Sequence, residues 1–172
     1  MPDIENLEQL MEQHTERLFR IAYYYTKDLQ IAEDIVQDVF IKFYHHQKHY
    51  EERGEIKAYL ARMTINRSKD YLKSWAFRKI VLQHKLFSKQ KTVIKDALIQ
   101  HDEQTILDEA ILRLPIKQRE PIVYFYLEDM PIKEIAELLG IPEGTVKSRL
   151  KKGKELLKRD LQDIEWEVLY NE

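Results

Sequence analysis

Two segments of this sequence have the residue types that bind a polyanion. Residues 144–159 carry 7 basic and 1 acidic side chains, and residues 61–95 carry 10 basic and 1 acidic side chains. Acidic segments surround both, because residues 1–60, 96–143 and 160–172 have net charges of -5, -7 and -5. Lys and Arg neutralise phosphate oxygens, and clustering strengthens that effect. The pattern indicates two separate polyanion-binding surfaces, with two solvated lysine-rich helix faces as the alternative.

The C-terminal basic segment belongs to a predicted pair of short helices. Pro131 suits the first turn of one helix, and Gly140 suits its left-handed end. A second helix is predicted from about Pro142 to Arg159, with its apolar residues on one stripe. Two short helices joined by a Gly-containing turn form a helix-turn-helix, whose second helix fits the major groove of DNA. The candidate DNA contacts on the second helix are Thr145, Lys147, Ser148, Arg149, Lys151 and Lys152. An ordinary helical hairpin is the alternative.

The other basic segment predicts a helix that starts near Glu55 and runs at least to Ser74. Its polar side chains recur at i, i+4, i+7 and i+11, so they fall on a single stripe. Phosphate binding needs such clustering, and an Asn side chain offers a base both a donor and an acceptor. The stripe consists of Arg62, Asn66, Lys69 and Lys73, with Arg67 beside it.

An acidic face with one apolar residue is predicted on the preceding helix. Between residues 32 and 44 the apolar side chains recur at steps of three and four, as in a helix packed into a globular core. Asp34, Gln37 and Asp38 fall on the opposite side, and Ile41 joins them at i+3 and i+4. An apolar residue within an exposed acidic face favours a protein partner, with a solvated acidic surface as the alternative.

These patterns predict an all-α fold of two small helical domains joined by a linker. The expected N-terminal helical domain covers residues 1–75, the linker residues 76–104, and the C-terminal domain with the helix-turn-helix residues 105–172. The C-terminal domain also contains a short helix predicted over roughly Lys117 to Leu127, with Pro121 near its first turn. Only 4 Gly and 5 Pro in 172 residues leave little for a turn-rich β architecture.

Composition excludes several classes of function. The absence of cysteine removes disulfides, thiolate zinc sites and cysteine nucleophiles. The sequence has no clustered carboxylates for two metals, no phosphate-binding glycine loop and no nucleophile-base pair, so an enzyme acting on nucleic acid is not expected. The acidic start MPDIENLEQL is unlike a signal peptide, and no apolar run of about 18 residues occurs. We therefore expect a cytoplasmic protein with no cofactor and no direct membrane insertion.

Two stretches together resemble a known family. The fourth conserved region of sigma factors resembles EIAELLGIPEGTVKSRLKKGKELLKR, although response-regulator-type helix-turn-helix domains share that pattern. The second conserved sigma region is similar to LFRIAYYYTKDLQIAEDIVQDVFIKFYHH and to IKAYLARMTINRSKDYLKSW. Larger sigma factors have a further domain between these regions. The resemblance is therefore to the compact extracytoplasmic-function class, which catalyses no reaction and directs RNA polymerase to promoters.

The resemblance implies partners and roles for the residues above. Core RNA polymerase would bind Asp34, Gln37 and Asp38, with Ile41 beside them. The -10 element of promoter DNA would be bound by the α-helical stripe together with Arg67, that is by Arg62, Asn66, Arg67, Lys69 and Lys73. The helix-turn-helix would bind the -35 element. Aromatic and planar side chains next to a basic groove can stack on unpaired bases. The candidates for holding a flipped base are His49, Tyr50 and Arg53.

Two alternatives and one further partner complete the expectations. A polar helix end or a metal site would also account for the histidines around His49. A stand-alone helix-turn-helix regulator is the rival function, although such proteins usually pair the motif with a ligand-binding or receiver domain. The family resemblance implies an anti-sigma partner that covers the binding surfaces until a signal arrives.

Overall fold

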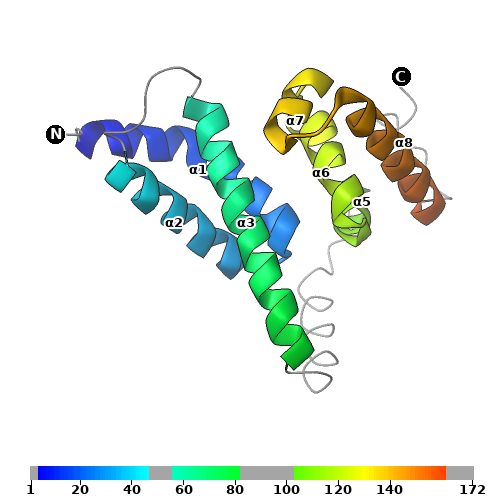
Figure 1. Ribbon diagram of the computed structural model, residues 1–172, viewed down its shortest axis with the longest axis horizontal. Helices are drawn as coiled ribbons and strands as arrows, with labels where there is room; N and C mark the ends of the chain where they lie inside the picture. Colours follow the sequence, from blue (N-terminus) through cyan, green and yellow to red (C-terminus); the bar gives the residue numbers. More distant parts are fainter. Residues whose placement is uncertain (1–3, 47–55, 82–102, 162–172) are drawn as a thin grey trace. The chain divides into compact units, whose positions relative to one another are not determined.

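The computed structural model describes residues 4–46, 56–81 and 103–161 of the chain. Within these ranges all regular secondary structure is helical, which confirms the predicted all-α class (Figure 1). The chain divides into two compact units, Met1–Leu82 and Gln83–Glu172. Each unit has its own buried core, so each is described by itself.

The first unit is a three-helix arrangement of α1 (Ile4–Thr26), α2 (Leu29–His46) and α3 (Ile56–Val81). All three helices pack against one another. The apolar stripe predicted for α2 is buried, as expected for a helix that faces a globular core. The core is formed by Leu18, Ala22, Ala32, Ile35, Val36, Val39, Phe40, Phe43 and Leu60.

A tight reversal joins α1 to α2 and fixes where α2 begins. Lys27 adopts a left-handed backbone with φ of 58°, and its N–H donates to the Tyr23 carbonyl at 2.7 Å. The Asp28 carboxylate then accepts a hydrogen bond from the N–H of Ile31 at 3.0 Å. A side-chain acceptor at this position satisfies one of the N–H groups that a helix start leaves unpaired. The capping by Asp28 thus sets the register of α2.

Helix α3 packs through small buried hydroxyl residues in its middle. Thr64 and Ser68 are both fully buried, and their hydroxyls donate to the carbonyls of Leu60 and Thr64 at 2.9 and 2.7 Å. The helix continues to Val81, so the first six residues of the expected linker 76–104 are helical. The stretch AFRKIV contains no Gly or Pro that would stop the helix. Residues 82–102 lie outside the described part of the chain.

The second unit contains short helices around a separate core. Its elements are α5 (Glu103–Arg113), α6 (Ile116–Ile122), the π-helical turn η2 (Val123–Leu127), α7 (Ile132–Leu139) and α8 (Glu143–Asp160). An ion pair joins α5 to α8, with Arg113 Nε at 3.1 Å from Asp160 Oδ2. The buried Arg119 donates from Nη2 to the Leu114 carbonyl at 2.8 Å, which satisfies one of the donors of its guanidinium.

The helix expected over Lys117 to Leu127 is two elements, and Pro121 does not lie near the first turn. Helix α6 begins at Ile116, because Pro115 is an extended N-cap residue whose carbonyl accepts from Gln118 and Arg119. Pro121 is therefore the sixth residue of α6, in its second turn. The wider π turn η2 follows, and the N–H of Glu128 donates to the Val123 carbonyl at 3.1 Å.

The predicted helix-turn-helix is formed by α7 and α8. Gly140 ends α7 with φ of 65° and ψ of 37°, the left-handed conformation expected there. Pro131 precedes α7 as its N-cap residue. Pro142 is likewise the N-cap of α8, and its carbonyl accepts from Thr145 and Val146. The turn between the two helices therefore consists of residues 140–142.

Close packing of α8 on α6 depends on Gly153. A Cβ atom at this position would lie 2.8 Å from Ile122 Cγ1 and 3.5 Å from Gln118 Cβ. We expect Gly153→Val to destabilise the second unit by about 1–3 kcal/mol, because the added atoms overfill a packed interface. Gly144→Ala is the matched control, since a Cβ there meets nothing within 4 Å. Hydrogen exchange should accelerate at α6 and α8 in the Val variant, whereas unchanged protection would contradict the packing argument.

Candidate nucleic-acid and protein interfaces

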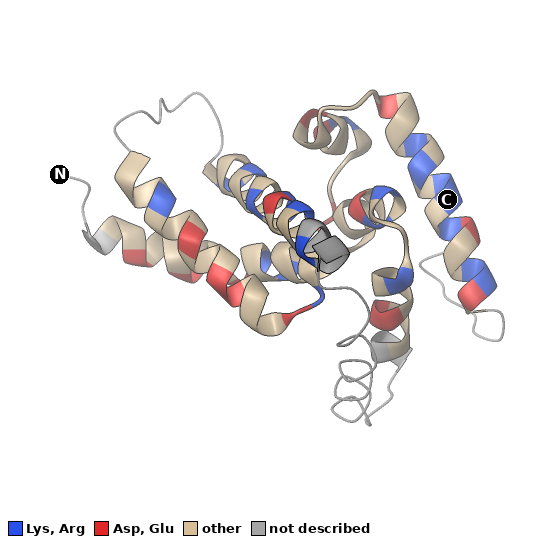
Figure 2. Cartoon of the chain, turned by 60° about the horizontal axis from the view of Figure 1, so that its bottom comes forward, with Lys and Arg blue, Asp and Glu red and all other residues tan. Residues whose placement is uncertain are grey.

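The acidic face of α2 is exposed and lies opposite its buried stripe. Asp34, Gln37 and Asp38 are all exposed, and Ile41 is 58% exposed, which is high for a large apolar side chain. The Asp34 carboxylate accepts a hydrogen bond from Gln30 Nε2 at 3.3 Å. Figure 2 shows Asp and Glu in red along this helix. The structure thus brings together all four residues of this predicted surface.

Asp38 is paired with a cation from α3. Both Nε and Nη2 of Arg67 donate to Asp38 Oδ2, at 3.2 and 3.0 Å. The two side chains are about half exposed, at 45% for Arg67 and 52% for Asp38. The sequence prediction placed Arg67 beside the basic stripe and missed this contact. The sequence signal for this contact is limited to the rotation of about 100° per residue in a helix, which turns Arg67 away from Asn66 and the rest of the stripe.

The four residues predicted to form the basic stripe on α3 lie on one face of the helix, and Arg67 does not share that face. Arg62, Asn66 and Lys73 are exposed, and Lys69 is half-buried. Their spacing within one continuous helix puts the four on one face. This face combines three cations with an amide, which suits phosphate oxygens and one base edge.

The predicted stacking residues His49, Tyr50 and Arg53 lie in residues 47–55, outside the described part of the chain. Near them, α2 ends with His45 and His46, and His46 Nδ1 is 2.8 Å from the Lys42 carbonyl. Among the described residues no group of three His, Asp or Glu side chains could hold a metal ion.

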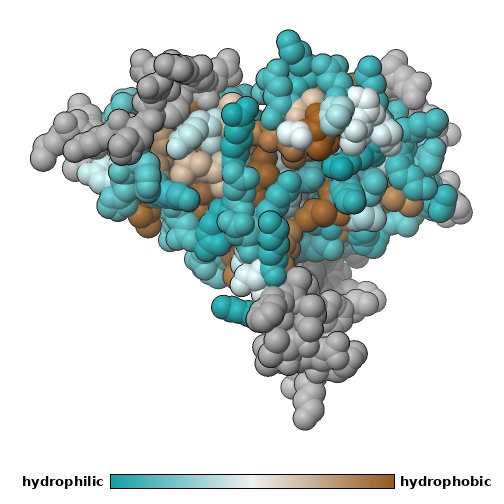
Figure 3. Space-filling view, viewed as in Figure 1, coloured by the Kyte–Doolittle hydropathy of each residue, from teal (hydrophilic) through white to brown (hydrophobic). Residues whose placement is uncertain are grey.

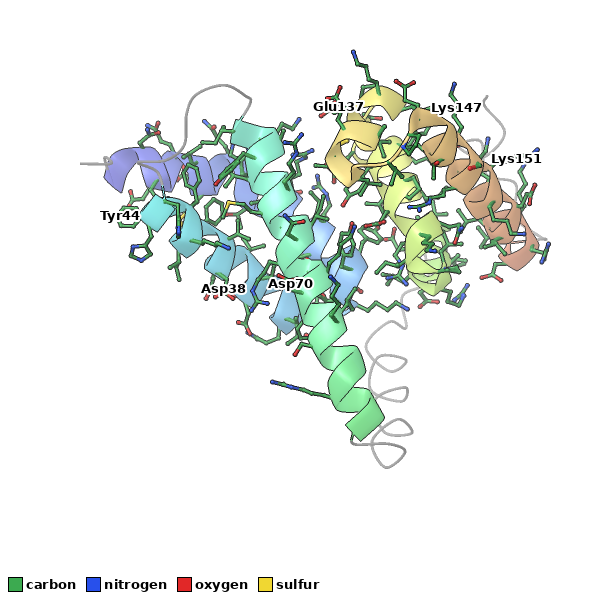
Figure 4. All side chains as sticks on the ribbon, in the orientation of Figure 1. Asp38, Tyr44, Asp70, Glu137, Lys147 and Lys151 are labelled. Carbon is green, nitrogen blue, oxygen red and sulfur yellow. The ribbon has the colours of Figure 1, made fainter. Side chains whose placement is uncertain are left out.

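Helix α8 presents the predicted DNA contacts on its exposed side. Lys147, Ser148, Lys151 and Lys152 are exposed, whereas Thr145 and Arg149 are half-buried. The buried side of the helix consists of Val146, Leu150, Gly153 and Leu157. The labelled Lys147 and Lys151 project away from the helix in Figure 4, and the surface over α8 is mostly hydrophilic in Figure 3.

The local contacts leave these α8 side chains available. Ser148 Oγ donates to the Thr145 carbonyl at 3.1 Å, a bond within the same helix. Lys152 Nζ lies 3.9 Å from Glu155 Oε2, a long ion pair between exposed groups that contributes little. The arrangement is a cationic, hydroxyl-containing helix face next to a tight turn, which matches the geometry of a helix that enters the major groove.

Family comparisons assign both units. The model of Sigma-70 region 2 matches residues 10–77, and the model of Sigma-70 region 4 matches residues 104–157. The RNA polymerase sigma factor SigV of Bacillus subtilis is 30% identical over 160 residues, which cover 86% of each chain. The ECF RNA polymerase sigma factor SigW of the same organism is 24% identical, over 94% of this chain and 92% of SigW.

Solved structures of similar fold agree with these matches. The sigma factor RpoE of Bartonella quintana, in complex with the anti-sigma factor NepR, has a TM-score of 0.69 at 19% identity and covers 94% of this chain and 100% of that chain. CnrH, in complex with the cytosolic domain of CnrY, has a TM-score of 0.68 at 19% identity and covers 95% of this chain and 92% of that chain.

The fold and the two matched regions define a sigma-70-type transcription factor with a region 2 and a region 4. The chain belongs to the extracytoplasmic-function sigma factors, which direct RNA polymerase to promoters and are not enzymes. The predicted family and function are therefore confirmed. No helix in the described ranges is long and apolar enough to cross a membrane.

Proposed function

We propose that the sigma function of this chain is divided among three helix faces. The α2 face of Asp34, Gln37, Asp38 and Ile41 binds core RNA polymerase. The α3 stripe, together with the loop residues His49, Tyr50 and Arg53, binds the -10 element. Helix α8 reads the -35 element through the following residues: Thr145, Lys147, Ser148, Arg149, Lys151 and Lys152.

The separation of charge between α2 and the basic faces supports this division most directly. Helix α2 exposes carboxylates and one large apolar side chain, which suit a protein surface better than a phosphate backbone. Helix α8 exposes cations opposite a buried stripe, as a helix in the major groove must. We infer that the DNA-binding faces of α3 and α8 are distinct from the polymerase-binding face of α2.

Each unit of the chain binds one promoter element. The expected domain 1–75 serves as region 2 and binds the -10 element, and residues 105–172 serve as region 4 and bind the -35 element. Residues 76–104 link the two domains. Helix α3 carries the region 2 unit a few residues further, to Val81. We also infer that the protein acts in the cytoplasm, where its polymerase and promoter partners are.

An anti-sigma partner is part of the proposed regulation. One structure of similar fold is the sigma factor RpoE in complex with the anti-sigma factor NepR, and the other is CnrH in complex with the cytosolic domain of CnrY. We infer that a protein of this kind inhibits the present chain. An inhibitor that covered the α2 face would block assembly with polymerase, because both would compete for Asp34, Asp38 and Ile41.

Run-off transcription with purified core polymerase on genomic fragments tests the proposed function. The chain alone should make core polymerase start at specific sites. Fluorescence anisotropy on one such promoter, at fixed salt, distinguishes a sigma factor from a stand-alone helix-turn-helix regulator. A stand-alone regulator would bind its site with nanomolar affinity without polymerase and would give no new transcripts. Weak binding by the free chain and specific transcripts with core enzyme are the expected results.

A further inference from the structure

Arg67 lies apart from the other cations of α3. The residues of the stripe recur on one side of the helix, whereas Arg67 is about 100° around the axis from Asn66. Its guanidinium reaches α2 and donates twice to Asp38 Oδ2, at 3.0 and 3.2 Å. Arg67 therefore belongs spatially to the surface of α2.

The charged side chains near Arg67 are mostly carboxylates, with Lys42 one turn beyond Asp38 on the exposed face of α2. Asp38 is in direct contact, and Asp34 is one turn away from Asp38 on the same exposed face of α2. Asp70 follows Arg67 at i+3 on α3 and is also exposed. Figure 4 labels Asp38 on α2 and Asp70 on α3. Carboxylates on both sides repel phosphate, so this position is poorly suited to a contact with the DNA backbone.

The geometry of the pair leaves Asp38 able to bind a partner. Both hydrogen bonds from Arg67 go to Oδ2, and Oδ1 accepts none from the described residues. The carboxylate is held in one orientation while its second oxygen remains available. A side chain that is already ordered loses less conformational entropy when a partner binds it.

We propose that Arg67 is a positioning residue of the polymerase-binding surface and not a contact to the -10 element. This surface, as proposed for α2, extends onto α3 and consists of Asp34, Asp38, Ile41 and Arg67. Arg67 orients Asp38, and the matching patch of core polymerase offers a cation to Asp38 Oδ1. The inference rests on the proposed role of α2 in binding core polymerase.

Two single substitutions on α3 separate the two roles of a cation. Arg67→Leu and the control Arg62→Leu each remove one exposed cation from the same helix. Arg67→Leu should raise the Kd for core polymerase by about 3- to 10-fold, the value of one pre-ordered side chain. It should leave the salt dependence of promoter binding by the holoenzyme unchanged. Arg62→Leu should leave the Kd for core polymerase unchanged. It should reduce by about one the magnitude of the slope of log K for promoter binding against log salt concentration, which we call the salt slope.

A charge swap distinguishes positioning from support of the fold. Asp38→Arg combined with Arg67→Asp restores an ion pair between the same two helices. If the pair only held α2 against α3, the swap would recover full affinity for core. We expect affinity as weak as that of Asp38→Arg alone, because polymerase would then meet the wrong charge. Circular dichroism should be unchanged throughout, since exposed ion pairs add little stability.

Several outcomes would overturn the inference. A fall of about one in the salt slope for Arg67→Leu, with unchanged affinity for core, would make Arg67 a DNA contact. No change in either quantity would make the pair an ordinary surface ion pair. Asp34→Lys serves as the test of the α2 face itself, since among the described residues the hydrogen bonds of Arg67 go to Asp38 and that of Asp34 comes from Gln30. Normal core binding by Asp34→Lys would refute the proposed function, whereas a loss there combined with no effect of Arg67→Leu would refute only the role of Arg67.

Discussion

Reversing the charge of Asp34 and Asp38 together is expected to abolish binding to core RNA polymerase. Both carboxylates are exposed on α2, opposite the buried stripe that holds the helix in the core. Two lysines would place like charges against the cations of the partner, and each such contact costs several kcal/mol. The affinity should therefore fall by about 1,000-fold or more. The fold should remain, since neither side chain contributes to the core.

Co-purification with core polymerase measures the expected loss of binding, and circular dichroism measures whether the helical fold is retained. Glu8→Lys with Glu12→Lys is a matched control, because it makes the same change in net charge at two exposed positions of α1. The control should bind core polymerase normally. Normal assembly by the α2 double variant would show that the acidic face of α2 is not the polymerase-binding surface.

Replacing Lys147, Ser148 and Lys152 by Ala should cause the second large effect, a loss of -35 recognition. One good base contact is worth about 1–3 kcal/mol, so the holoenzyme should lose about 100-fold or more of its preference for a promoter with an intact upstream element. Helix α8 should stay folded, because the three side chains are exposed and Ala is the best helix former. Binding to core should not change, since the substitutions lie in the other unit.

The position of the cations on α8 matters as much as their number. Lys158→Ala with Arg159→Ala also removes two cations, but from the last turn of α8. The N-terminal part of a recognition helix contacts base edges, so this control should preserve the preference for the upstream element. Footprints of the holoenzyme report both variants. Full upstream protection after the triple substitution would refute the assignment of α8.

Regular helices with strong sequence signals could be predicted closely. Gly140 predicted the end of α7 and so the turn of the helix-turn-helix, because few residues other than glycine tolerate its left-handed backbone angles. The alternation of buried and exposed residues on α2 followed from a period of 3.6 residues alone. The family and its function followed from the order of the two matched stretches.

Tertiary contacts and irregular turns could not be predicted. Spacing puts Arg67 on α3 and Asp38 on α2, but the ion pair between them depends on how the two helices cross. Pro121 lies in the second turn of α6 and not near the first, because α6 begins at Ile116 after its N-cap Pro115 and ends at Ile122. The π turn was missed because a 3.6-residue period cannot describe a wider turn. The roles of His49, Tyr50 and Arg53 remain predictions.

The π turn η2 also bears on how this chain can change in evolution. A π turn closes its hydrogen bonds over five residues, from Val123 to Glu128, whereas an α turn closes them over four. Deletion of one residue there could convert η2 to a regular α turn without moving Gly153 away from Ile122. Elsewhere in α6 or α8 a deletion would rotate the following side chains by about 100° and expose the core. Length differences among homologues of this unit should therefore concentrate at residues 123–127.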